Sequence, residues 1–137
     1  MAQKKISISK SAKCPCGSGL KYSACCGPFI KQSKHALIAE ALMRSRYTSY
    51  VIKNEEYLLS TWHHSTRPES LNLDGDVAQW LRLSILNTDA GTENDMEGMV
   101  EFNAEFKVNE QKQSLHEISR FIKEDDHWYY VDGDESE

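Results

Sequence analysis

Hydrophobic residues in the second half of the chain recur at every second position. Between residues 100 and 108, Val, Phe, Ala, Phe and Val alternate with Glu, Asn, Glu and Lys. This alternation is typical of a strand with one buried and one solvated face. Leu81, Leu83 and Ile85 repeat the pattern, and residues 115–123 and 127–132 complete four strands. Polar turns at 89–98, 109–113 and 124–126 join them, which predicts an antiparallel meander.

The first half of the chain has a helical period instead. Ser33 is suited to cap a helix over about residues 34–53, whose largely apolar stripe contains one cation, Arg44. Asn54 followed by two glutamates predicts a second helix that ends near residue 63. Residues 65–76 form a loop in this interpretation. Two helices before a meander predict an α+β domain with the helices packed on one face of the sheet.

The strand pattern places a carboxylate on the inner face of the predicted sheet. If Leu115 and Phe121 face the core, Glu117 and Ser119 share that face. We favour a structural ion pair between Glu117 and Arg44, because a buried carboxylate is rarely left unpaired. The alternative is a general base whose pKa is raised in an apolar cavity, assisted by His63 or Tyr130. We expect the cavity to be lined by Arg44, Tyr47, Trp62, His63, Trp80, Glu117, Ser119 and Tyr130.

All four cysteines lie within thirteen residues, in a C-x-C-x₈-C-C pattern formed by Cys14, Cys16, Cys25 and Cys26. Four thiols at this spacing suit one tetrahedral Zn²⁺. Two disulfides would require an oxidising compartment, and the start of the sequence has no export signal; the C-x-x-C spacing of redox thiols is also absent. Four protein ligands leave no open position, so we expect a structural ion, with Lys21 as the neighbouring cation.

The charge of the chain is divided unevenly. The 137 residues carry −5 overall, but residues 1–34 contain seven lysines and no acid, for +7, and residues 35–137 carry −12. The lysines are Lys4, Lys5, Lys10, Lys13, Lys21, Lys31 and Lys34. Nucleic-acid or ribosome binding is one interpretation of this basic end. We favour a flexible, solvated tail over residues 1–13, because lysine-rich segments with few apolar residues seldom order alone.

No stretch of the sequence approaches the ~18–20 apolar residues of a membrane-spanning helix. With 39% apolar and 27% charged residues, we expect a soluble, cytoplasmic protein without a membrane span.

The cysteine segment C-P-C-G-S-G-L-K-Y-S-A-C-C resembles the SEC-C motif, the zinc-binding tail first described in the bacterial preprotein translocase ATPase. In that translocase the tail docks on other proteins. The resemblance therefore implies that residues 14–28 are an adaptor element that binds a protein partner.

The rest of the chain resembles the YchJ family of bacterial proteins. The similarity lies in L-M-R-S-R-Y (42–47), Y-L-L and T-W-H (57–63), E-x-S-R-F (117–121) and W-Y-Y-x-D-G (128–133). That family joins a SEC-C motif to a nuclear-transport-factor-two-like domain, in which a curved sheet wraps against helices around a cone-shaped pocket. The resemblance implies such a domain over residues 29–133, before an acidic tail at 134–137. Longer members carry a second C-terminal cysteine motif; here we expect one Zn²⁺ per chain.

Three functions follow from these patterns. We favour a zinc-binding interaction or adaptor module that docks a protein partner, with a pocket that holds a peptide or small molecule without chemistry. The second is a small pocket enzyme that uses Glu117 as its general base. The third is a nucleic-acid or ribosome-associated protein that binds through its basic N-terminus.

Overall fold

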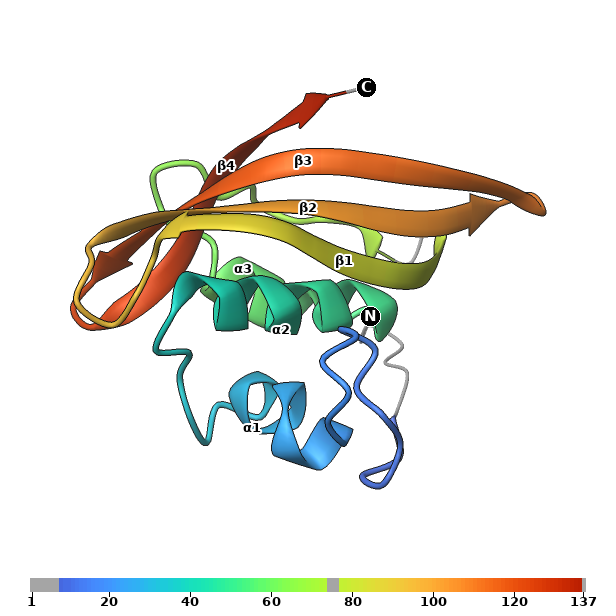
Figure 1. Ribbon diagram of the computed structural model, residues 1–137, viewed down its shortest axis with the longest axis horizontal. Coiled ribbons are helices and arrows are strands. Elements are labelled where there is room, and N and C mark those ends of the chain that lie inside the picture. The colour runs from blue at the N-terminus through green and yellow to red at the C-terminus, as the bar shows by residue number, and fades with distance from the viewer. Residues whose placement is uncertain (1–7, 74–76, 137) are drawn as a thin grey trace.

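The molecule is built in three layers around one central helix. The computed structural model describes residues 8–73 and 77–136. Helix α2 (Ala39–Val51) lies across one face of a four-stranded sheet, and the N-terminal segment lies on the far side of α2 (Figure 1). We call residues 12–30 the knuckle; it contains the 3₁₀ turn η1 (Tyr22–Ala24) and helix α1 (Cys26–Ile30). Helix α2 is therefore covered on two sides, which leaves it little exposed surface.

The sheet is an antiparallel meander in the order β1-β2-β3-β4. Its strands are β1 (Gln79–Ala90), β2 (Glu97–Val108), β3 (Gln111–Glu124) and β4 (His127–Ser136). The predicted α+β class, with helices on one face of an antiparallel sheet, is confirmed.

The strands are longer than the alternation predicts because their turns are tight. Asn109 and Glu110 have φ of 51° and 66°, and Asp125 and Asp126 have φ of 53° and 66°. Positive φ at both central positions is typical of two-residue turns whose twist matches that of the strands. Strand β4 also continues into residues 134–136, which the sequence analysis assigned to an acidic tail.

The inner face of the sheet forms the core with α2. Val100, Phe102 and Ala104 of β2 are buried, as is Phe121 of β3. These positions follow the predicted period of two. On β1 the period breaks: register shifts fall between Trp80 and Arg82 and between Ile85 and Asn87.

The alternating pattern predicted that Leu81 faces the core, and this prediction is wrong. Leu81 lies at the first register shift and is 40% exposed, whereas Leu83 is buried opposite Ala104. A bulge inserts one residue and re-aims the side chains on either side of it. Here it allows Trp80, paired with Phe106, to share the inner face with Leu83.

Helix α2 begins at Ala39, five residues later than predicted. Ile38 is extended, and the Ala39 N–H donates to the Gly91 carbonyl at 2.9 Å. Ser33 does not cap α2, because its hydroxyl donates to the Pro28 carbonyl and closes α1 instead. Tertiary hydrogen bonds therefore hold residues 34–38 in a non-helical form.

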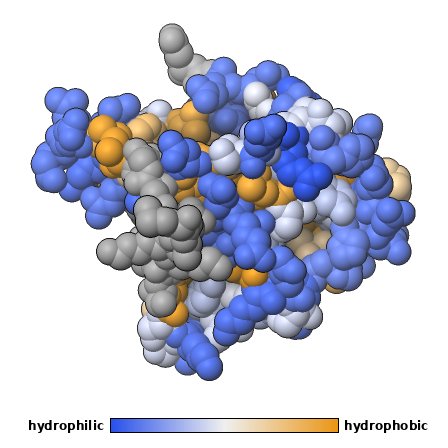
Figure 2. Space-filling view, turned by 180° about the vertical axis from the view of Figure 1, so that it is seen from behind, coloured by the Kyte–Doolittle hydropathy of each residue, from blue (hydrophilic) through white to orange (hydrophobic). Residues whose placement is uncertain are grey.

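The next helix, α3 (Glu55–Ser60), begins where predicted. The Asn54 side chain accepts a 3.1 Å hydrogen bond from the Tyr57 N–H, as expected of a cap. Among the described residues, every helix is too short or too polar to cross a membrane. From behind, the surface is mostly hydrophilic, with separated apolar patches (Figure 2).

Candidate functional site

The four cysteines converge on one point at the face of the knuckle that meets α2. Their sulfur atoms all lie within 4.8 Å of one another. The Sγ–Sγ distance is 3.6 Å between Cys16 and Cys25 and 4.0 Å between Cys25 and Cys26. A tetrahedral ion with metal–sulfur bonds of about 2.3 Å would place its sulfurs about 3.8 Å apart. The cluster therefore has the dimensions of a four-coordinate metal site and can hold a metal ion.

The local chain path brings the cysteines together. The Cys14 N–H donates to the Leu20 carbonyl at 2.8 Å, which closes the loop between the two cysteine pairs. Gly17, in the turn, has a backbone φ of +82°, which residues with a Cβ rarely adopt. Cys26 is the first residue of α1, so the helix fixes the last ligand.

Several donors surround the sulfur atoms. Hydrogen bonds from the thiols of Cys14 and Cys26 lower the pKa of the Cys16 thiol, and the Ser18 side chain and backbone N–H add to the effect. The Ser18 hydroxyl also lies 3.1 Å from Cys25 Sγ. Burial raises the pKa of Cys25 to about 11. The surroundings of Cys16 thus favour the thiolate, the form in which cysteine binds a metal.

The cation beside the cluster is Arg44, whereas the sequence pointed to Lys21. Arg44 Nη1 donates to the Cys16 carbonyl at 2.8 Å and lies 3.9 Å from Cys16 Sγ. Its Nε pairs with Glu40 at 3.0 Å. The predicted Arg44–Glu117 pair is therefore not formed, and Arg44 does not line the pocket described below.

Thr48 is the second residue of α2 that contacts the cluster. This fully buried side chain places Oγ1 3.4 Å from Cys26 Sγ and 3.7 Å from Cys14 Sγ. Arg44 and Thr48 are one helical turn apart, so a single face of α2 meets the cysteines.

The opposite side of α2 and the sheet enclose a pocket of about 230 Å³. Its lining is mostly aromatic and apolar with a few polar groups, as is typical of small-molecule sites. The lining residues are Met43, Arg46, Tyr47, Tyr50, Trp80, Phe102, Ala104, Leu115, Glu117, Ser119 and Tyr130. Five of the residues expected from sequence are brought together here: Tyr47, Trp80, Glu117, Ser119 and Tyr130.

Two other expected residues lie outside this pocket. Trp62 packs edge-on against Tyr130, with ring centroids 4.9 Å apart. His63 is buried, and its Nε2 lies 2.9 Å from a Glu124 carboxylate oxygen. Its Nδ1 accepts a hydrogen bond from the Ser65 N–H. Both imidazole nitrogens thus have partners within the protein.

The pocket cation is Arg46, which the sequence analysis missed. Arg46 is 3% exposed, and its Nη1 donates to the Leu58 carbonyl and to Thr61 Oγ1, both at 2.7 Å. The guanidinium carbon lies 4.6 Å from the Tyr130 ring centroid and 5.1 Å from that of Trp62. Met43, Arg46 and Tyr50 are three to four residues apart, so they lie on one face of a helix. This spacing is the sequence pattern from which Arg46 could have been predicted to share a face with Met43 and Tyr50.

Glu117 is held at the pocket wall by its own strand and by β4. The Ser119 hydroxyl donates to Glu117 Oε2 at 2.6 Å. Gly133 on β4 leaves room for this carboxylate, since a Cβ there would overlap the Glu117 side chain. Burial, followed by the charge of Glu117, raises the pKa of Tyr130 to about 12. Tyr130 therefore stays protonated beside the carboxylate.

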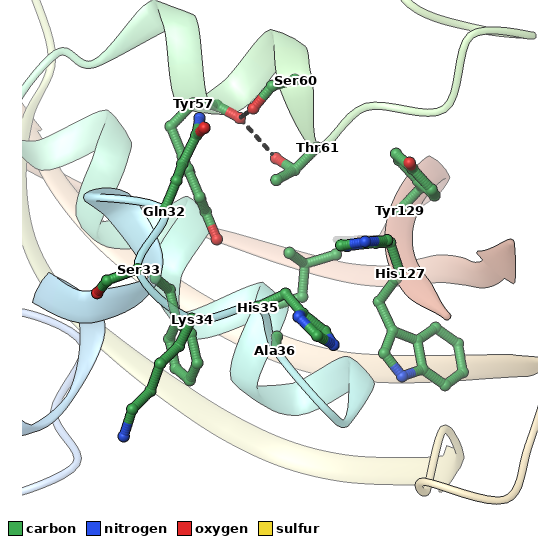
Figure 3. A pocket seen from close by; sticks show the side chains of 13 residues that line it. Gln32, Ser33, Lys34, His35, Ala36, Tyr57, Ser60, Thr61, His127 and Tyr129 are labelled. Carbon is green, nitrogen blue, oxygen red and sulfur yellow. Dashed lines mark hydrogen bonds between the residues drawn. The ribbon is translucent and has the colours of Figure 1, made fainter. Parts of the chain in front are cut away.

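A second, more polar hollow of about 320 Å³ lies between the segment 32–36 that follows the knuckle, helix α3 and the start of β4. The rings of His35 and His127 both line it and lie next to each other, with centroids 4.6 Å apart (Figure 3). Ser33 and Lys34 point away from the space between the two imidazoles (Figure 3). The Lys34 side chain lines the hollow but is therefore directed away from the two imidazoles.

Comparisons with known proteins agree with this architecture. The chain matches the family described as "YchJ, middle NTF2-like domain" over residues 38–133 and the SEC-C motif over residues 11–28. A UPF0225 protein of Chromobacterium violaceum is 50% identical over 125 residues, which cover 89% of this chain and 92% of the relative. One from Photorhabdus laumondii is 47% identical over 126 residues, covering 88% and 79% of the two chains.

Two solved structures share the fold. The solution structure of a SEC-C motif containing protein from Rhodopseudomonas palustris has a TM-score of 0.80 at 34% identity and covers 90% of this chain and 98% of that one. A crystal structure of such a protein from Psychrobacter arcticus has a TM-score of 0.74 at 26% identity, with coverage of 93% and 85%. With a SEC-C knuckle packed on an NTF2-like domain, the chain belongs to the YchJ (UPF0225) family.

Proposed function

We propose that the protein is a zinc-stabilised binding module whose pocket between α2 and the sheet takes up a small molecule. The observation that carries this proposal is the Trp80 indole N–H. Trp80 lines the pocket, and its N–H is buried and, within the described part of the chain, has no hydrogen-bond partner. A buried donor without a partner costs about 1–3 kcal/mol. An acceptor on a bound ligand would recover that cost.

The pocket is preformed by aromatic packing. The Trp80 ring lies 5.1 Å from Phe106 and 6.1 Å from Tyr47, measured between centroids. These neighbours come from α2 and β2, so the indole is held from two elements. Fixed walls reduce the entropy that binding must overcome.

The second part of the proposal is that Cys14, Cys16, Cys25 and Cys26 hold one structural Zn²⁺. Four thiolates are a typical ligand set for zinc in a closed site, which supplies folding stability and no reactive position. The cluster contacts Arg44 and Thr48 on one side of α2, and Arg46 and Tyr47 line the pocket from the same helix. The ion would therefore hold the helix that shapes the pocket.

Docking of a protein partner through the outer face of the knuckle is a second candidate function. The backbones of Lys13 and Lys21 form an isolated antiparallel β-bridge. Two exposed lysines therefore lie on neighbouring segments of the chain. Leu20, beside them in sequence, is 54% exposed. An acidic partner surface would complement this arrangement. Binding of an acidic peptide should weaken at least fivefold in a Lys13→Glu/Lys21→Glu variant and remain unchanged in a Lys112→Glu control.

A catalytic role would use Glu117, the carboxylate at the pocket wall. It would act as a general base on a bound substrate. Chemical conversion of a pocket ligand that stops in Glu117→Gln, while binding persists, would support this role over simple binding.

The indole N–H groups offer a direct test of the pocket. The chain has three tryptophans, and the other two N–H groups already donate, Trp62 to Thr66 and Trp128 to the Leu37 carbonyl. In ¹⁵N-labelled full-length protein, a ligand should shift the Trp80 indole signal, assigned with Trp80→Phe, and leave the Trp128 signal in place. Binding that shifts the Trp128 signal instead would contradict the proposal.

A further inference from the structure

The pocket holds two opposite charges that do not neutralise each other directly. Arg46 and Glu117 both line it; burial lowers the pKa of Arg46, and the charge of Glu117 is among the interactions that oppose this shift. Among the residues that the structure describes, neither forms an ion pair within 4.0 Å. The pocket therefore has a fixed donor on α2 and a fixed acceptor on β3 that are not in direct contact.

Arg46 and Glu117 are each held by hydrogen bonds within the described part of the protein, and each keeps further donor or acceptor atoms that make no such bond. The two hydrogen bonds of Arg46 use Nη1, which leaves Nε and Nη2 as donors. The Ser119 hydroxyl occupies Glu117 Oε2, which leaves Oε1 as an acceptor. Because the Arg46 guanidinium also packs against the rings of Trp62 and Tyr130, it cannot turn toward Glu117 without losing these contacts.

This pair selects against ligands that carry a single charge. An anionic group at Arg46 would lie near the Glu117 carboxylate, and a cationic group at Glu117 would lie near the guanidinium. A neutral group that accepts from one side and donates from the other satisfies both residues. An amide does so, because its carbonyl oxygen accepts and its N–H donates.

The remaining walls determine the shape of the ligand. Trp80, Tyr47 and Phe102 contribute aromatic rings to the lining, and Met43 and Leu115 contribute apolar side chains. Rings stack and pack well against such walls. The unpaired Trp80 N–H supplies a place for a further acceptor.

We propose that the pocket ligand is a neutral, planar small molecule whose amide bridges Arg46 and Glu117, with its carbonyl oxygen at Arg46 and its N–H at Glu117. This inference rests on the proposed function, since it names the class of ligand that the same pocket binds. It does not depend on the metal or on any reaction.

Three probes of nearly equal shape test the charge preference: benzamide, benzoate and benzylamine. Each is titrated into the metal-loaded, full-length protein while the Trp80 indole signal is followed. Benzamide should bind at least tenfold more tightly than either charged probe. In Glu117→Gln the wall gains a net positive charge, so benzoate should gain at least tenfold relative to benzamide.

Glu105→Gln is the matched control, because Glu105 lies on β2 opposite Arg82 and does not line the pocket. It should leave the ranking of the three probes unchanged. Tightest binding of a charged probe to the unmodified protein, or an unchanged ranking in Glu117→Gln, would overturn the amide inference alone. If all three probes leave the Trp80 signal in place, the proposed pocket function fails with it.

Discussion

Replacing Arg46 with methionine should destabilise the protein far more than the same change at Arg44. Arg46 is buried and donates two 2.7 Å hydrogen bonds to neutral acceptors. Hydrogen bonds to charged groups contribute about 1.5–3 kcal/mol each. Methionine refills part of the space and avoids burying a charge, which offsets part of the loss of these two hydrogen bonds, and we expect a net loss of about 3–5 kcal/mol in the free energy of unfolding.

Arg44 offers a matched comparison two residues away. It is half-buried and pairs with Glu40 one turn earlier, an arrangement that contributes about 0.3–0.5 kcal/mol. Its hydrogen bond to the Cys16 carbonyl adds to this, and we expect a total loss of about 1–2 kcal/mol.

Urea unfolding followed by far-ultraviolet circular dichroism measures both losses on metal-loaded protein. The slope with urea should stay the same, so that the midpoints report stability. An Arg44→Met variant that loses as much as Arg46→Met, or more, would refute the assignment of Arg46 as the buried cation of α2.

Three further predictions concern the pocket wall, the metal and alkaline pH. Gly133→Ala should displace the Glu117 carboxylate, because the added Cβ would lie 2.6 Å from its carboxyl carbon. We expect the free energy of unfolding to fall by about 1–3 kcal/mol. An unchanged urea midpoint would contradict this prediction. A chelator with a reducing agent should lower the melting temperature measured by circular dichroism, and an unaltered melting temperature would contradict a structural ion. Burial raises the pKa of Tyr47, Tyr57 and Tyr130 to about 12 from 10.0. Their contribution to stability is therefore complete below pH 10 and lost as pH rises toward 12. Ionisation of all six tyrosines of the chain at pH 10, followed by tyrosinate absorbance with the fold intact, would argue against it.

The features that the sequence predicts well depend on neighbours in the chain. The four cysteines are spaced so that one short loop brings them together, and the period of two along β2 and β3 places Glu117 and Ser119 inward. Both arguments need only local geometry, and the structure agrees with both.

The arginine of the pocket could not be chosen from sequence because α2 is buried on two sides. Residues 44 and 46 lie about 200° apart around a helix, so one faces the knuckle and the other the sheet. A search for a single apolar stripe assumes one buried face, and it selected Arg44. Which side meets the sheet is settled by the packing of the knuckle, a contact between distant segments.

Two other differences arise from contacts that no local pattern encodes. Leu81 turns outward because β1 has a bulge where it pairs with β2. Helix α2 begins five residues later than predicted because the Ala39 N–H donates a hydrogen bond to the Gly91 carbonyl. In both cases a partner distant in sequence overrides local propensity.

Native mass spectrometry of full-length protein purified without chelators tests the central claim most directly. A zinc-stabilised binding module should carry one Zn²⁺ per chain and a small molecule that dissociates when the chain is denatured. Trp80→Phe should retain the zinc and carry less of the ligand. A native chain that has neither zinc nor a bound small molecule would contradict the account.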